Sequence, residues 1–132
     1  MLSARHVALV LGVGYVGAAL VQQLLDDADT VVGVDNLFST DPTVIAQFQR
    51  HPRFRFVEGS ITDPSVLNTA LEIARAAECS SPRGGGEEPG PEIIVYLLAA
   101  QASGHPHAAP ADYTEETNLR GPRLVIEAMR RA

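Results

Sequence analysis

The sequence predicts an α/β fold in which a doubly wound parallel sheet lies between two layers of helices. Short apolar runs without alternation recur along the chain, as in strands that are covered on both faces. Segments with apolar residues at helical spacing separate these runs. Glycines spaced G-x-G-x-x-G follow the first run directly. Together these observations indicate parallel strands joined by crossover helices.

The first unit of the fold is expected near the N-terminal end. Val7 to Leu11 is too short for a helix and suits a buried strand. After the glycines, apolar residues recur at helical intervals as far as Leu25. A second apolar run from Val31 to Val34 predicts the next strand, which Asp35 ends.

The later elements follow from capping signals and apolar patterns. Asp41 and Pro42 are typical of a helix start, as is Pro64 preceded by Thr62 or Asp63. Pro122 predicts a kink in the last helix, because proline cannot donate to the carbonyl of Asn118. The expected elements are a helix from 42 to about 51, a strand at 54–57, a helix at 64–74, a strand at 93–98 and a helix from 110 to the end.

Right-handed crossovers between these strands give the sheet order 3-2-1-4. Ligands of such sheets bind beyond the carboxyl ends of the strands, where the order reverses between strands 1 and 4. The segment between Cys79 and Glu92 is rich in glycine, proline, serine and glutamate, and we expect a flexible surface loop there. Residues 1–132 are therefore expected to form one domain.

The glycine motif predicts a dinucleotide site in a Rossmann-type sheet. Gly12 permits a sharp turn, Gly14 leaves space for a pyrophosphate, and Gly17 permits close packing of helix and strand. Free N–H groups at the helix start favour an anion. Asp35 lies at the position of an acid that accepts hydrogen bonds from both adenosine ribose hydroxyls, which favours NAD over NADP. The alternative is a packing turn with Asp35 a solvated strand end.

Composition excludes several classes of function. The net charge of −6 disfavours a nucleic-acid or anionic-membrane partner. The single cysteine, Cys79, permits no internal disulfide and fits a reducing cytoplasm. Residues 7–21 resemble a signal peptide or membrane span, but their glycines and the following Gln22 and Gln23 argue against both. His105 and His107 have no third ligand nearby in sequence, so no metal site is expected.

Five motifs in order resemble those of the extended short-chain dehydrogenases. The most similar subgroup is the NAD-dependent sugar-nucleotide epimerases and dehydratases, such as the UDP-glucose 4-epimerases. The resemblance covers nearly the whole chain outside 79–92. The motifs are Gly-Val-Gly-Tyr-Val-Gly at 12–17, Val-Asp-Asn-Leu at 34–37, Phe-Val-Glu-Gly-Ser-Ile-Thr-Asp at 56–63, Leu-Ala-Ala-Gln-Ala-Ser at 98–103 and the stretch from Tyr113 to Gly121.

The resemblance implies a set of cofactor-binding residues for each part of NAD. The pyrophosphate would contact Gly12, Gly14, Tyr15, Val16 and Gly17. The adenosine ribose would contact Asp35 and Asn36, with Ser39 and Thr40 on its phosphate side, and adenine would lie between Ser60 and Ile61. The nicotinamide half would contact Ala99, Ala100 and Gln101, which Asn118 would brace.

Four residues depart from the family pattern. Leu11 replaces the first of three glycines, and Ser60 replaces an aspartate that accepts from the adenine amino group. Leu97 lies where family members commonly have a histidine, and Pro122 lies where they have a threonine. We expect these changes to affect cofactor affinity more than the fold.

The resemblance implies a tyrosine base, tuned by a lysine four residues later, on a fifth strand and helix. This chain has no lysine, so Tyr15, Tyr96 and Tyr113 are not expected to serve, and no catalytic residue is assigned. An exposed apolar fourth strand is also unusual as an open edge. We therefore expect an incomplete sheet, from the N-terminal part of a longer enzyme acting on a nucleotide sugar.

Two other functions remain open from the residues alone. One is a non-catalytic dinucleotide sensor or regulatory module, complete as written. The other is a related reductase that uses NADPH, against which Asp35 speaks because a 2′-phosphate favours a nearby arginine. If the protein forms an oligomer, the expected assembly is a homodimer.

Overall fold

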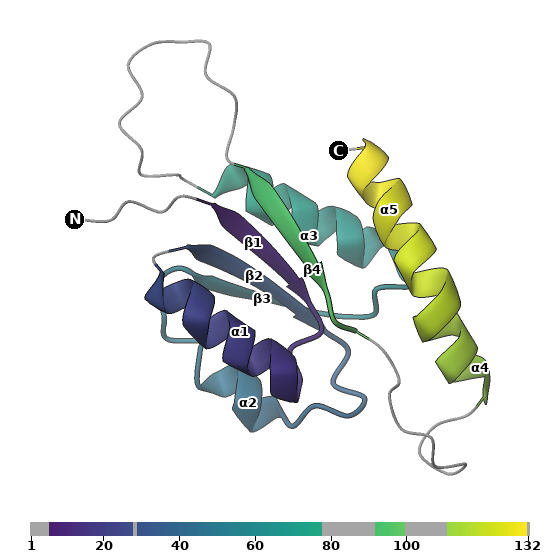
Figure 1. The fold of residues 1–132 in the computed structure, drawn as a ribbon, viewed down its shortest axis with the longest axis horizontal. Helices are drawn as coiled ribbons and strands as arrows, with labels where there is room; N and C mark the ends of the chain where they lie inside the picture. The colour runs from purple at the N-terminus through teal and green to yellow at the C-terminus, as the bar shows by residue number, and fades with distance from the viewer. Residues whose placement is uncertain (1–5, 28, 78–91, 100–110, 132) are drawn as a thin grey trace.

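The computed structural model describes residues 6–27, 29–77, 92–99 and 111–131. The described residues form a four-stranded parallel sheet in the order β3-β2-β1-β4, which confirms the predicted topology (Figure 1). The strands are β1 (Val7–Leu11), β2 (Thr30–Asp35), β3 (Phe54–Glu58) and β4 (Ile93–Leu97). The loop expected at 79–92 lies outside the described residues except for Glu92.

The register brings the carboxyl ends of the strands to one edge of the sheet. Leu11 of β1 lies opposite Val34 of β2 and Leu97 of β4. Asp35 lies opposite Glu58 at the end of β3. The segments that follow all four strands therefore start at the same edge, where the predicted site residues were expected to meet.

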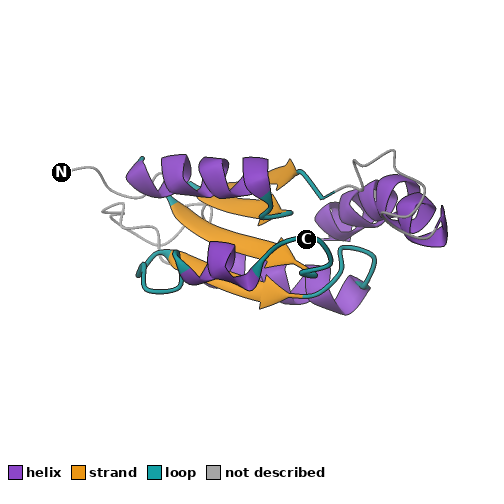
Figure 2. Ribbon diagram, turned by 90° about the horizontal axis from the view of Figure 1, so that it is seen from below, coloured by secondary structure: helices purple, strands orange, loops and turns teal. Residues whose placement is uncertain are grey.

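Helices cover both faces of the sheet (Figures 1 and 2). The side chains of β1 and β2 alternate between the two faces, and nearly all of them are buried. The helical elements are α1 (Tyr15–Asp26), α2 (Pro42–Ala46), α3 (Pro64–Ala76), α4 (Ala111–Glu115), the π-helical turn η1 (Glu116–Arg120) and α5 (Gly121–Arg131).

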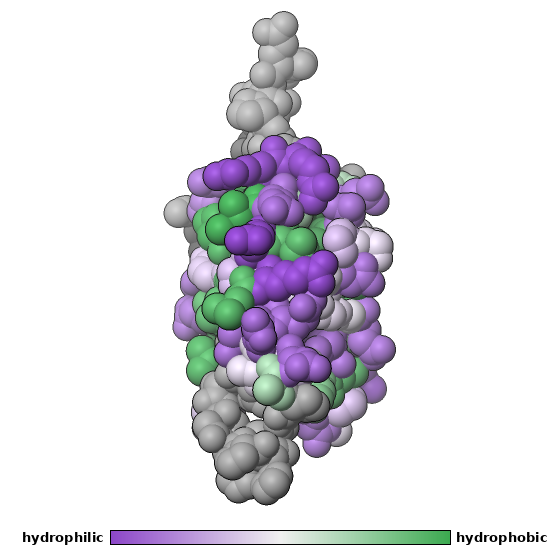
Figure 3. Space-filling model, turned by 90° about the vertical axis from the view of Figure 1, so that its right-hand side faces the viewer, coloured by the Kyte–Doolittle hydropathy of each residue, from purple (hydrophilic) through white to green (hydrophobic). Residues whose placement is uncertain are grey.

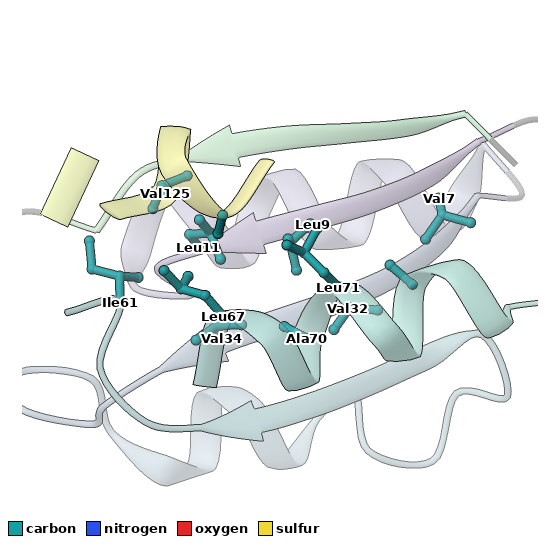
Figure 4. Close-up of a cluster of buried hydrophobic side chains, with 12 residues drawn as sticks. Val7, Leu9, Leu11, Val32, Val34, Ile61, Leu67, Ala70, Leu71 and Val125 are labelled. Carbon is teal, nitrogen blue, oxygen red and sulfur yellow. The ribbon is translucent and has the colours of Figure 1, made fainter. Parts of the chain in front are cut away.

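Each face of the sheet has its own apolar core. On one face Leu9 and Val32 pack with Leu67 and Leu71 of α3, and α5 adds Val125 (Figure 4). On the other face the core comes from β1, β2, β3, α1 and α2, and comprises Ala8, Val10, Val13, Val21, Leu24, Leu25, Val31, Ile45, Phe48 and Phe54. These double-sided cores explain the apolar runs without alternation.

The helix after Pro42 is shorter than the sequence predicts. Its α-helical part ends at Ala46, and the chain then tightens into i→i+3 turns, in which the N–H of His51 donates to the carbonyl of Phe48. Proline at 52 disfavours a helical conformation at His51. The tightened turn also places the ring of Phe48 against that of Phe54, with centroids 5.5 Å apart.

The last helical stretch contains a π turn just before Pro122. The N–H of Gly121 donates to the carbonyl of Glu116, five residues earlier, and residues 116–120 form η1. Proline has no N–H to continue the α-helical ladder, so the sequence correctly predicted an irregularity near this position. In the structure this irregularity takes the form of a π turn at 116–120.

The outer side of η1 and α5 carries exposed apolar residues among polar ones (Figure 3). Leu119 is 69% exposed, Ile126 51% and Met129 45%. Separately, none of the helices in the described part of the chain is long and apolar enough to cross a membrane.

The acid that caps α3 makes stability depend on pH. Asp63 accepts hydrogen bonds from the Ser65 hydroxyl and N–H, which lower the pKa of its carboxyl. Because the folded-state pKa is depressed, the carboxylate contributes its full stability above the unfolded pKa of ~3.9 and loses it as pH falls through the folded value. Asparagine caps helices about equally well without titrating.

We therefore expect Asp63→Asn to differ little from wild type in acid and to lack the loss of stability that protonation of Asp63 causes as pH falls from neutral through its folded-state pKa, which lies below the unfolded ~3.9. Thermal unfolding followed by circular dichroism across that range measures the difference in Tm between the two proteins. Asp63→Ala removes the cap and should lower Tm already at neutral pH. A Tm difference between wild type and Asp63→Asn that does not change with pH would contradict this account.

Candidate functional site

A cavity of about 270 Å³ opens at the carboxyl edge of the sheet. It lies where β1 leads into α1, between the segments that follow β2 and β3 on one side and β4 on the other. This is the point at which the strand order reverses, the usual ligand position in such sheets. The lining residues are Gly12, Gly14, Tyr15, Val16, Gly17, Val34, Asp35, Asn36, Ser39, Thr40, Gly59, Ser60, Ile61, Leu98, Ala99, Tyr113 and Thr117.

The floor of the cavity is a close contact between backbones. Gly12 has a φ of +104°, which favours glycine, and its N–H donates to the carbonyl of Val34 over 2.8 Å. A Cβ at Gly12 would lie 2.6 Å from the nitrogen of Ala99. A Cβ at Gly17 would lie 2.1 Å from the carbonyl oxygen of Gly12. The glycines at 12 and 17 are therefore required for the turn and for the packing of α1 against it.

The N-terminal end of α1 faces the cavity without a side chain to cap it. Gly14 is the N-cap residue and supplies no side-chain hydrogen bond, and the first turn contains no acidic residue. Tyr15 is 99% exposed and Val16 67%. The first N–H groups of an α-helix lack intrahelical partners, and the helix dipole is positive there. This end of the cavity can therefore hold an anionic group such as a phosphate.

Asp35 is the hydrogen-bonding centre of the opposite wall. Its Oδ2 accepts from the N–H of Val13 over 2.9 Å and from the hydroxyl of Thr40 over 3.0 Å. Its Oδ1 accepts from the N–H of Leu37 over 2.7 Å. A carboxylate offers about four acceptor sites. Three of them are thus used within the protein, which leaves about one acceptor site free.

The side chain of Asn36 is also held by the protein. Its Nδ2 donates to the hydroxyl oxygen of Tyr113 over 2.9 Å, and its Oδ1 accepts from the N–H of Phe38 over 3.0 Å. Asn36 is exposed, so its side chain remains accessible from solvent. The resemblance suggested direct contact with the ribose; the structure adds a second role, which is to tie the loop after β2 to α4.

Two further segments close the cavity. Ser60 follows β3, and its hydroxyl lies 2.6 Å from that of Thr62 and accepts from the N–H of Thr62. Ile61 is buried and belongs to the core beneath α3. Thr117 of η1 is 7% exposed and also lines the cavity. The π turn therefore presents a polar side chain to the site.

Most of the residues that the sequence singled out lie around this one cavity. Ala100 and Gln101 fall outside the described residues. Asn118 is described and is not among the lining residues, whereas its neighbour Thr117 is. The predicted residues that line it are Gly12, Gly14, Tyr15, Val16, Gly17, Asp35, Asn36, Ser39, Thr40, Ser60, Ile61 and Ala99.

Sequence reasoning missed five lining residues, namely Val34, Gly59, Leu98, Tyr113 and Thr117. Gly59 could have been inferred, because it directly follows the third strand at the same edge. Tyr113 begins one of the five motifs, but no local signal placed it at the cavity, since it meets Asn36 across 77 positions of sequence.

No group of three or more potential metal ligands occurs among the described residues. His105 and His107, which the sequence analysis considered for a metal, lie outside them. Tyr113 lines the cavity, but its hydroxyl is engaged with Asn36.

The chain is similar to known proteins in both sequence and structure. Residues 8–80 match the model of the NAD dependent epimerase/dehydratase family. The chain is 28% identical over 119 residues to a UDP-glucose 4-epimerase of Mycolicibacterium smegmatis. That alignment covers 90% of this chain and 33% of the mycobacterial protein.

Two solved structures illustrate the similarity in three dimensions. The UDP-glucose 4-epimerase of Thermotoga maritima, solved with UDP-glucose, has a TM-score of 0.68 at 26% identity, covering 92% of this chain and 33% of that one. The dTDP-glucose 4,6-dehydratase DesIV of Streptomyces venezuelae, solved with NAD, has a TM-score of 0.67 at 27% identity, covering 92% and 35%. The chain thus spans about a third of the length of these relatives.

Proposed function

The chain belongs to the NAD dependent epimerase/dehydratase family, and from this membership we propose that its cavity binds NAD as part of a sugar-nucleotide epimerase or dehydratase. NAD is the cofactor of that family. The observation that carries the proposal is the position of one cavity between the uncapped end of α1 and the carboxylate of Asp35. In a dinucleotide site the helix end holds the pyrophosphate and the carboxylate holds the adenosine ribose.

The residues present fit a dinucleotide in both shape and chemistry. A Cβ at Gly14 would meet only the Thr40 hydroxyl, at 3.6 Å, so the glycine leaves open space beside the helix end. The oxygens of a pyrophosphate there would accept hydrogen bonds from the first N–H groups of α1. Asp35 retains about one free acceptor site for a ribose hydroxyl, and its negative charge disfavours the additional phosphate of NADP.

We assign the remaining contacts along the cavity as follows. Asn36, Ser39 and Thr40 lie beside Asp35 and would surround the adenosine ribose and its phosphate. Ser60 and Ile61 would flank adenine. Ala99, with Ala100 and Gln101, would lie under the nicotinamide half, which Asn118 would brace. Thr117 also lines the cavity.

The proposed substrate is a nucleotide-linked sugar, as in the two epimerases and the dehydratase that resemble this chain. When bound, NAD would supply the redox chemistry by accepting a hydride from a sugar hydroxyl and returning it. The residues described here bind and orient the cofactor. We assign no acid, base or nucleophile among them, because without lysine no tyrosine can be tuned in the way that the family resemblance implies.

The remaining expectations on partners and location belong to the proposal. A single cysteine and a net charge of −6 fit a cytoplasmic protein without a nucleic-acid or membrane partner. The exposed apolar residues Leu119, Ile126 and Met129 fit a homodimer.

Titration calorimetry with NAD, NADH and NADP tests the proposed function. We expect saturable heat with NAD or NADH and weaker binding of NADP, because Asp35 repels its 2′-phosphate. Absence of heat with both NAD and NADH would overturn the assignment. Tighter binding of NADP would favour the reductase alternative. To separate an enzyme from a binding module, the product of the complete coding frame is assayed for conversion of UDP-glucose.

A further inference from the structure

Two aromatic rings from distant segments stack beside the cavity. Phe38 lies in the loop after β2, and Tyr113 lies on α4. Their ring centroids are 4.1 Å apart and their planes are inclined by 20°. Phe38 is 48% exposed, so the stack is not part of either core of the sheet. We call these two residues the aromatic bracket.

A polar link reinforces the aromatic bracket. The hydroxyl oxygen of Tyr113 accepts from Nδ2 of Asn36, and Oδ1 of Asn36 accepts from the N–H of Phe38. The three residues thus form a closed set of contacts between the loop after β2 and α4. Asn36 can turn away only if its bonds to Tyr113 and Phe38 both break.

The position of the aromatic bracket relates it to the cavity. Asn36 and Tyr113 both line the cavity, and Asn36 follows Asp35 directly. α4 buries none of its own residues and leads directly into η1 and α5, which do bury residues. Tyr113 joins α4 to the loop after β2 through its stack on Phe38 and its hydrogen bond with Asn36.

We propose that Phe38 and Tyr113 are positioning residues that hold Asn36 and keep the adenosine end of the cofactor site closed. This inference rests on the proposed function, because it takes the ligand to be NAD. The adenosine half would lie between Asp35 and Ser60, beside the bracket. Release of the cofactor then requires the stack and the Asn36 bond to open, so the bracket slows dissociation.

The test uses the dissociation rate of NADH, followed by its fluorescence in a stopped-flow displacement by excess NAD. Phe38→Ala and Tyr113→Ala should each speed release by about tenfold, from the loss of an aromatic stack and, for Tyr113, of a hydrogen bond. Tyr113→Phe keeps the ring and should have a smaller effect. Phe38→Tyr keeps the aromatic stack and should release NADH as slowly as the wild-type protein does.

A comparison of cofactor fragments separates positioning from a general structural role. ADP-ribose contains the adenosine half and should bind more weakly to the alanine variants. Nicotinamide mononucleotide lacks that half and should be unaffected by the same substitutions. Ile126→Ala removes an exposed apolar side chain from α5 and serves as the matched control, with release expected at the wild-type rate.

The outcomes distinguish the two proposals. Wild-type protein that binds NADH, with release from both alanine variants unchanged or slower, would overturn the aromatic bracket and leave the NAD site standing. Equal weakening of both fragments would also overturn it, because the effect would then be a general change in fold. Wild-type protein that binds no cofactor would overturn both proposals.

Discussion

Replacing Asp35 with alanine is expected to weaken NAD binding by about 1–3 kcal/mol for each hydrogen bond lost to this charged group. The structure indicates a second consequence that the sequence alone did not. The carboxylate also accepts from the N–H groups of Val13 and Leu37 and from the hydroxyl of Thr40. Asp35→Ala should therefore lower Tm as well, because these donors lose a partly buried acceptor.

Calorimetry with NAD and thermal unfolding, measured on the same preparations, separate the two effects. Asp35→Asn preserves the shape of the side chain but removes its charge and one acceptor oxygen, so both affinity and Tm should fall between those of wild type and alanine. Glu58→Gln is the matched control, since Glu58 lies opposite Asp35 in the sheet register and is exposed. An NAD affinity of Asp35→Ala equal to that of wild type would rule out the proposed ribose contact.

Replacing Gly14 with valine is expected to abolish NAD binding while leaving the fold nearly unchanged. The backbone at Gly14 has a negative φ of −84°, and a Cβ there meets only the Thr40 hydroxyl. The added methyl groups would occupy the space that we assign to the pyrophosphate. Losing two charge-assisted hydrogen bonds of the helix N–H groups costs about 3 kcal/mol or more, over a hundredfold in Kd.

Gly17→Ala provides the contrasting control within the same motif. Its Cβ would lie 2.1 Å from the carbonyl oxygen of Gly12, so α1 must shift and Tm should fall clearly. Circular dichroism should thus show that Gly14→Val is stable and that Gly17→Ala is destabilised. NAD titration should show that Gly14→Val binds no cofactor. Near wild-type affinity in Gly14→Val would place the pyrophosphate elsewhere.

The elements that the sequence predicted correctly are those whose signals are local. An apolar run such as Val7 to Leu11 carries its own evidence of burial on both faces, and the helix caps at Asp41 and Asp63 are read directly from neighbouring residues. The sheet order follows from these elements by the handedness of crossover connections. The glycine turn and Asp35 could be placed at one edge for the same reason.

The features that the sequence did not predict depend on contacts between distant segments. The i→i+3 turns after Ala46 form where Phe48 packs on Phe54, and the irregularity expected near Pro122 takes the form of the π turn η1.

By itself the sequence determined the order of strands and helices, the glycine turn and the acid at the end of the second strand, because short-range periodicity and backbone sterics govern them. The tertiary structure alone decided how the acceptor sites of Asp35 are shared and that Asn36 bonds Tyr113 across 77 positions. Such contacts form only when the sheet brings separate loops to one edge, and no local pattern encodes that distance.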